Sequence, residues 1–141
     1  MLSYEASGVA RAAPEAVWAA WVDVASWSES EHIESARLDG EFQPGNVITS
    51  KAKGLPRSKL TITRVEPPRL WVDESRFPGL KMTFEHVIAP GEAGTELTER
   101  VLIRGPLARV VGILMRRKLE ALFDASVAHV AHRAEQQVQP L

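Results

Sequence analysis

Turn-forming residues recur at short intervals through the middle of this chain of 141 residues, and they constrain its fold more than any other feature. The segments between them are short and carry no helical stretch, which predicts antiparallel hairpins in a meander. The turns are marked by Asp39-Gly40, Pro44-Gly45, Gly54-Leu55-Pro56, Pro67-Pro68, Pro78-Gly79, Pro90-Gly91 and Gly94, and we expect strands at about 33–39, 46–53, 58–66, 69–77, 80–89 and 95–104.

The N-terminal segment predicts one more strand and two short helices. Apolar and polar residues alternate over 2–10, as in a strand. Pro14 marks a helix start, because its fixed φ suits the first helical turn. Asp23 is expected to end this helix and to cap a second one at about 24–27. We expect Trp18 and Trp21 to anchor these helices to the core, and Trp27 to border a cavity entrance.

The C-terminal segment predicts the longest helix. Gly105-Pro106 ends the last strand, and a helix follows over about 107–137. Apolar residues recur along it at helical spacing: Leu107, Val111, Leu114, Leu122, Val130 and Ala134.

These elements predict an α+β fold in a single domain, 1–141. A seven-stranded antiparallel sheet needs cover on one face, and only one helix is long enough to provide it. A strongly curved sheet around a single helix leaves space between them. The sequence therefore predicts an internal cavity.

Composition excludes several functional classes. The chain has no cysteine, which excludes thiol catalysis, thiolate metal sites and disulfides. Its formal net charge of −1 gives no reason to expect nucleic acid or an acidic membrane surface. The first residues lack the pattern of a signal peptide, and no apolar run is long enough for membrane insertion. We expect a soluble cytoplasmic protein.

Five short motifs, in this order, resemble the SRPBCC (START-like, helix-grip) superfamily, polyketide cyclase/dehydrase type. They are Pro14-Glu15-Ala16-Val17-Trp18 with Asp23 and Trp27; Gly40 and Gly45; Ile62-Thr63-Arg64-Val65-Glu66-Pro67-Pro68-Arg69-Leu70; Gly94-Thr95-Glu96-Leu97-Thr98; and Gly105-Pro106-Leu107. The resemblance implies the helix-grip fold, a curved sheet wrapped around a long C-terminal helix, with two short helices after the first strand. It also implies a deep cavity for a lipid, a polyketide or another apolar molecule.

Strand alternation predicts which side chains face that cavity. On 80–89 the inward face carries Met82, Phe84 and His86, and on 95–104 it carries Leu97, Glu99 and Val101. A turn within 91–94 sets His86 opposite Glu99, in direct cross-strand contact. Such a pair suits acid/base chemistry, because the carboxylate can orient the imidazole and raise its basicity.

The strand at 69–77 leaves two alternatives open. One hairpin register points Trp71, Asp73 and Ser75 inward, and the other points Val72, Glu74 and Arg76 inward. An inward Arg76 would offer an anchor for a carboxylate ligand. The expected ligand-binding residues are Trp27, Trp71, Met82, Phe84, His86, Leu97, Glu99, Val101, Val111, Leu114 and Leu122, with His86 and Glu99 as the catalytic candidates.

The favoured hypothesis is binding of a small or medium hydrophobic ligand, such as a lipid, a polyketide or an aromatic metabolite. The alternative is an enzyme that cyclises or dehydrates a polyketide with His86 as acid/base. A third hypothesis, a protein-interaction module, calls for a conspicuous exposed apolar patch, which the pattern does not predict. His129 and His132 lack a third ligand at suitable spacing, so neither a metal nor another cofactor is expected. Formation of a homodimer is left open.

Overall fold

A computed structural model describes residues 2–138 of the chain, with side chains through residue 136. Its strands all pair antiparallel in one sheet, in the order β1-β7-β6-β5-β4-β3-β2. The elements are β1 (Leu2–Ala10), α1 (Pro14–Val22), the 3-10 helix η1 (Val24–Glu29), β2 (Ile33–Leu38), β3 (Val47–Ala52), β4 (Ser58–Glu66), β5 (Leu70–Phe77), β6 (Leu80–Gly91), β7 (Gly94–Arg104) and α2 (Ala108–Val138). The predicted helix-grip fold is confirmed.

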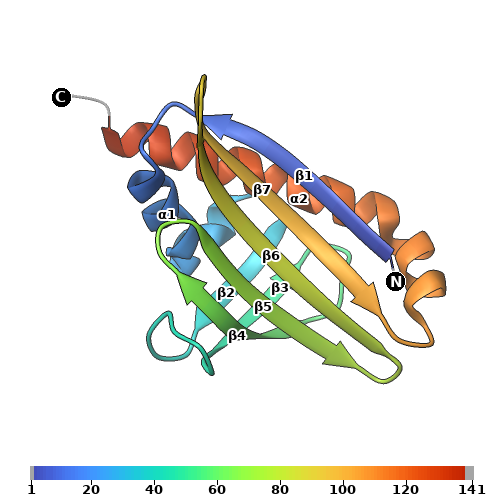
Figure 1. Ribbon diagram of the computed structural model, residues 1–141. Coiled ribbons are helices and arrows are strands. Elements are labelled where there is room, and N and C mark those ends of the chain that lie inside the picture. Colours follow the sequence, from blue (N-terminus) through green and yellow to red (C-terminus); the bar gives the residue numbers. More distant parts are fainter. Residues whose placement is uncertain (1, 139–141) are drawn as a thin grey trace.

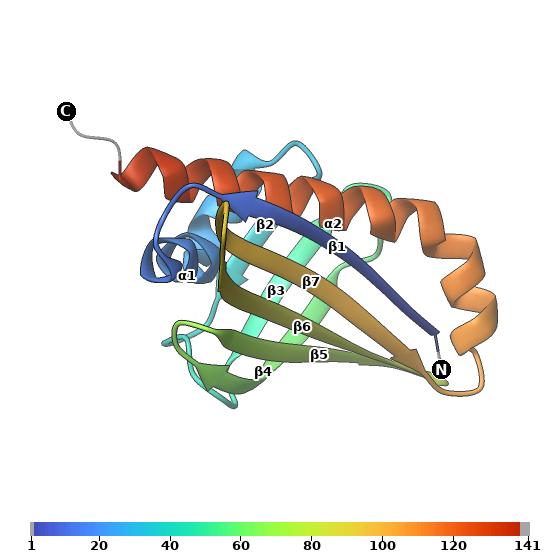
Figure 2. The same cartoon turned by 45° about the horizontal axis from the view of Figure 1, so that its top comes forward.

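The sheet curves around α2, and its distance from the helix differs from strand to strand. Helix α2 runs alongside β1, whereas β4 and β5 lie farthest from it (Figures 1 and 2). The close contact needs a small residue in β1, because a Cβ on Gly8 would lie 2.6 Å from Cγ1 of Val127. The buried core gathers here, where β7 contributes Leu97 and Val101 and α2 contributes Phe123. Space therefore opens where the sheet curves away from the helix.

The first turns of α2 bend away from the axis of its remainder (Figure 2). In this region the hydroxyl of Tyr4 donates a hydrogen bond to the carbonyl of Gly112 over 2.9 Å. A Cβ on Gly112 would lie 2.5 Å from Cδ1 of Leu2, so a larger residue here would require the Leu2 side chain to move. Insertion of a side chain into the hydrogen-bond ladder of a helix is one recognised cause of a bend.

Arg133 fastens the two N-terminal helices to α2. Its Nη2 donates to Oδ2 of Asp23 over 2.6 Å, and its Nη1 donates to Oε1 of Glu29 over 3.1 Å. Asp23 stands at the N-cap position of η1, but its carboxylate makes no capping bond there. The expectation that the Asp23 side chain caps this helix is therefore wrong. The guanidinium holds the carboxylate, while the backbone carbonyl of Asp23 accepts from the N–H of Ser26.

The outer face of the first turns of α2 exposes several large apolar side chains. Their exposed fractions are 46% for Leu107, 57% for Val110, 68% for Ile113 and 77% for Leu114. Leu114 was expected to line the cavity, and that prediction is wrong because the helical period puts Val111 and Met115 on the inner face instead. The prediction of no conspicuous exposed apolar patch is also wrong. None of the helices in residues 2–138 is long and apolar enough to cross a membrane.

Candidate ligand-binding cavity

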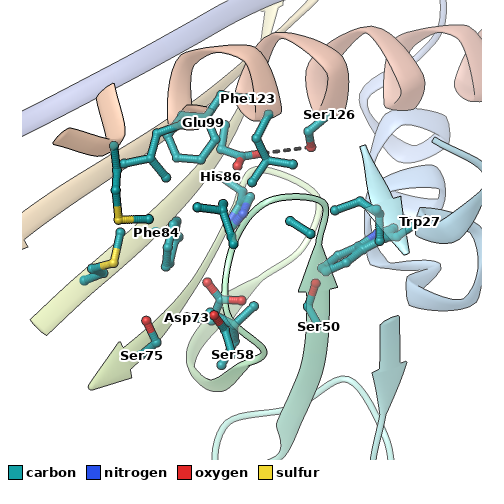
Figure 3. Close-up of a pocket in the computed structure, with 18 of the residues that line it drawn as sticks. Trp27, Ser50, Ser58, Asp73, Ser75, Phe84, His86, Glu99, Phe123 and Ser126 are labelled. Carbon is teal, nitrogen blue, oxygen red and sulfur yellow. Dashed lines mark hydrogen bonds between the residues drawn. The ribbon is translucent and has the colours of Figure 1, made fainter. Parts of the chain in front are cut away.

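A cavity of about 330 Å³ lies between α2, η1 and the inner face of the sheet from β2 to β7 (Figure 3). Its walls are mainly apolar side chains, interrupted by serines, two carboxyls and two imidazoles. The lining residues are Trp21, Trp27, Ser30, Ile33, Ser50, Ala52, Leu55, Pro56, Ser58, Leu60, Asp73, Ser75, Phe77, Leu80, Met82, Phe84, His86, Glu99, Val111, Met115, Leu119, Leu122, Phe123, Ser126, His129 and Val130.

Most of the residues expected at the cavity do line it. These are Trp27, Met82, Phe84, His86, Glu99, Val111 and Leu122. Leu97 and Val101 are fully buried, but in the core, where β7 lies close to the helices and leaves no space. Trp71 is also fully buried, behind the ring of His86 and outside the lining.

The open question about β5 has a definite answer in the structure. Trp71, Asp73 and Ser75 are buried on the inner face. Arg76 lies on the outer face, exposed, with its Nη2 3.3 Å from Oε1 of Glu74. It therefore offers no anchor to a ligand inside the cavity.

His86 is held by aromatic rings and by one backbone carbonyl. Its ring stacks on Trp71, and the edge-on indole of Trp21 has its centre 5.2 Å from the imidazole. Nδ1 of His86 lies 3.1 Å from the carbonyl oxygen of Trp71. Because a carbonyl can only accept, Nδ1 carries the proton and Nε2 keeps its lone pair. Burial lowers the pKa of His86 from 6.5 to about 3, so the ring is neutral at neutral pH.

Glu99 lies opposite His86 in the register that the sequence predicts, and that register is confirmed. Its Oε1, however, accepts a hydrogen bond from the hydroxyl of Ser126 over 2.9 Å (Figure 3). No hydrogen bond or ion pair joins His86 to Glu99 anywhere in residues 2–138. The expected direct pair is therefore wrong, because each side chain has found another partner. Burial raises the pKa of Glu99 from 4.5 to about 7, and the Ser126 bond offsets part of that rise.

Asp73 is the second buried carboxyl of the cavity. The residue is 1% exposed, and its Oδ1 has no hydrogen-bond partner among the described residues. Burial raises its pKa well above the ordinary value, and the nearby charge of Glu99 raises it further. Two carboxyls thus share one largely apolar space, where their neutral forms are favoured.

Sequence reasoning missed several wall residues because they depend on contacts between distant elements. Trp21 was expected in the core, yet it also lines the cavity. His129 lies in the wall, with Nε2 3.5 Å from the hydroxyl of Ser26, whereas His132 is exposed. Phe123 and Ser126 follow Leu119 and Leu122 at helical spacing, so the period of α2 was a usable signal for them. Among residues 2–138, no group of three or more His, Asp or Glu could hold a metal ion.

Sequence and structure comparisons agree with this geometry. The profile described as "Polyketide cyclase / dehydrase and lipid transport" matches residues 1–135. The chain belongs to this family. No curated protein sequence matches the chain.

Several solved structures have the same fold as this family member, although their sequences are only distantly similar to it. The di-domain ARO/CYC protein StfQ of the steffimycin biosynthetic pathway is 15% identical with a TM-score of 0.77, and the match covers 96% of this chain and 51% of StfQ. The chain thus spans about half the length of StfQ. KanY is 17% identical with a TM-score of 0.75, covering 95% of this chain and 97% of KanY. CV1439 from Chromobacterium violaceum is 17% identical with a TM-score of 0.71, and the match covers 96% of this chain and 99% of CV1439.

Proposed function

We propose that the protein binds a small or medium hydrophobic ligand, such as a polyketide, a lipid or an aromatic metabolite, in the cavity under α2. The observation that carries this proposal is the cavity itself, about 330 Å³ of space with mainly apolar walls and a few polar groups. Ligand sites typically have volumes of about 300–1,000 Å³ and this composition. The family, described by cyclisation, dehydration and lipid transport, supports the same class of ligand.

The charges in the cavity narrow the class of ligand. No lysine or arginine occurs among the described lining residues, whereas Asp73 and Glu99 both face the space. A fatty acid carboxylate would meet two acidic groups and no cation, which is unfavourable. In their neutral forms the two carboxyls can instead donate hydrogen bonds to ketone or phenol oxygens. The preferred ligand is therefore uncharged and carries oxygen atoms along an apolar frame.

Filling the cavity tests the proposal. Ser75 is buried on the cavity wall, so Ser75→Phe places a ring in the space, whereas Ser3 is exposed on β1 and Ser3→Phe serves as the matched control. We expect the wild type and the control to bind an apolar fluorescent dye and to release it to an uncharged aromatic polyketide, and Ser75→Phe to bind at least tenfold more weakly. Equal dye binding by all three proteins, with both variants folded by circular dichroism, would refute a ligand site in this cavity.

A second candidate function, acid/base catalysis of polyketide cyclisation or dehydration, is favoured by the buried carboxyls. The pKa of Glu99, about 7, lets this group take or return a proton at neutral pH. In an aldol cyclisation, the carboxylate takes a proton from the carbon between two carbonyls. That carbon then bonds to a third carbonyl carbon, and the resulting alkoxide takes the proton back from the carboxyl. StfQ and BexL are ARO/CYC proteins of biosynthetic pathways with the same fold, which is consistent with such chemistry.

The buried carboxyls are better acid/base candidates than His86. An imidazole with a pKa of about 3 is a weak base, although its Nε2 can accept a hydrogen bond from an enol. We expect Glu99→Gln to lower turnover of a poly-β-ketone at least 100-fold with little change in ligand affinity, and His86→Gln to have a smaller effect. Unchanged turnover in Glu99→Gln would remove this mechanism and leave ligand binding standing.

A further inference from the structure

The first three turns of α2 carry an apolar strip on their outer face. Val110, Ile113 and Leu114 share this face by their i, i+3, i+4 spacing, with Leu107 just before them, and all four are largely exposed. A contiguous patch of exposed apolar side chains rimmed by polar residues is typical of a protein or membrane interaction site. These turns stand at the edge of the molecule, where α2 bends away from its main axis (Figure 2).

The segment that carries this strip has charges of a single sign. Residues 107–118 contain Arg109, Arg116, Arg117 and Lys118 and no acidic residue, although the whole chain has a net charge of −1. Arg116 is paired with Glu120 and lies over the ring of Tyr4. The ammonium of Lys118 donates to the carbonyl of Gly54. Arg109 and Arg117 are exposed beside the strip.

We propose that this outer face of α2, residues 107–118, docks on an anionic lipid bilayer. A helix lies in a membrane interface when one face is apolar and cations flank it, which is the arrangement here. Each cation near an anionic leaflet strengthens binding about fivefold. Net charge alone does not predict this surface, because no acidic residue falls within 107–118 and the first one after it is Glu120, the partner of Arg116.

The observations favour a bilayer over a protein partner. A second copy of the chain, docked by the same face about a two-fold axis, would bring the exposed cations Arg109 and Arg117 against the same cationic face of its partner. Three turns of helix extend only about 16 Å. The strip is therefore small for a stable protein interface, which buries about 800 Å² on each side. A lipid interface needs only shallow burial of one helix face.

The position of the strip relates it to the cavity. On the opposite face of the same turns, Val111 and Met115 line the cavity, and Lys118 holds the turn at Gly54, next to the lining residues Leu55 and Pro56. Docking would place this side of the cavity at the lipid surface. The inference goes beyond ligand binding and does not require it, since empty protein would dock equally well.

Vesicle co-sedimentation tests the proposal. We expect the wild type to bind vesicles of 70% phosphatidylcholine and 30% phosphatidylglycerol, and to bind pure phosphatidylcholine at least tenfold more weakly. The double variant Ile113→Glu/Leu114→Glu should lose binding. Arg109→Ala/Arg117→Ala should weaken it about 30-fold in low salt, from about fivefold for each cation. Ala128→Glu adds a charge at an exposed position elsewhere on α2 and should bind like the wild type.

Three results would overturn the proposal. The first is no binding of the wild type to anionic vesicles. The second is equal binding by the wild type and Ile113→Glu/Leu114→Glu. The third is a dimer in light scattering that this double variant dissociates, which would assign the strip to a second copy of the chain. Because the dye assay on the cavity is carried out without lipid, failure here leaves the proposed ligand site separately testable.

Discussion

The imidazole of His86 lies flat on the indole of Trp71, with the ring centres 3.5 Å apart and the ring planes within 1° of parallel. The two residues are also cross-strand partners, and Nδ1 of His86 bonds the carbonyl of Trp71. One residue thus fixes both the position and the tautomer of the imidazole. The contacts of Trp71 therefore also determine which nitrogen of His86 can act in the cavity.

Trp71→Ala should be strongly destabilising. The fully buried indole contacts Trp21, Trp27 and Phe42 as well as His86, so its removal leaves a large hole among rigid rings. We expect a loss of about 3–5 kcal/mol in the free energy of unfolding, measured by urea titration. Trp18→Ala, at a half-buried position, should cost clearly less. Equal losses in the two variants would contradict this account of the cluster.

Glu99→Gln should change how stability depends on pH. The pKa of Glu99 rises from 4.5 to about 7 on folding, so between these values the folded state holds a proton that the unfolded state has lost. The group therefore stabilises the fold below pH 4.5, and this stability is lost as the pH rises to about 7. We expect the unfolding free energy of the wild type, relative to the variant, to fall by about 1.4 kcal/mol per pH unit over that range.

His86→Gln provides the matched measurement with the opposite sign. The pKa of His86 falls from 6.5 to about 3 on folding, so the unfolded state binds the extra proton between these values. Relative to this variant, the wild type should gain stability as the pH rises from about 3 to 6.5. Urea titrations in steps of half a pH unit separate the two groups. A flat difference for either variant would show that its pKa is not shifted.

Gly8→Ala should destabilise the protein, although alanine is usually tolerated better than glycine in a strand. Its Cβ would lie 2.6 Å from Cγ1 of Val127, which forces β1 away from α2. We expect a cost of about 1–3 kcal/mol. Adding Val127→Ala removes the clashing methyl group, so the double variant should be less destabilised than the sum of the single variants. Simple additivity would show that the contact is not tight.

Asp73→Asn should stabilise the fold at alkaline pH. A buried carboxyl oxygen without a partner costs about 1–3 kcal/mol. The amide removes the ionisable group, whose raised pKa shows that burial opposes its charge. We expect a gain of about 1 kcal/mol in thermal or urea unfolding at pH 8, where ionisation of the carboxyl is most costly to the fold. A variant less stable than the wild type would contradict this account, because it would show that the Asp73 carboxyl stabilises the fold.

The order of the elements and the register of the hairpins could be predicted because both are local. Turn residues fix where strands end, and alternation fixes which face is apolar, which is why the pairing of His86 with Glu99 was predictable. What side chains do within that register depends on distant segments. Ser126 donates a hydrogen bond to Glu99 from α2, and the carbonyl of Trp71 accepts one from Nδ1 of His86. Leu114 was misplaced because a pattern of apolar residues does not say which side of a helix meets the sheet.

The aromatic cluster also gives the protein an intrinsic fluorescence signal for the cavity. The four tryptophans are joined through ring centres no more than 6.3 Å apart, with Phe42 between Trp18 and Trp71. Excitation energy passes among indoles at such separations, so the emission belongs to the group. Trp21 and Trp27 stand in the cavity wall, and a molecule that settles beside them changes the polarity around the emitters. Occupancy of the cavity can thus be followed by the wavelength and intensity of tryptophan emission, without a label.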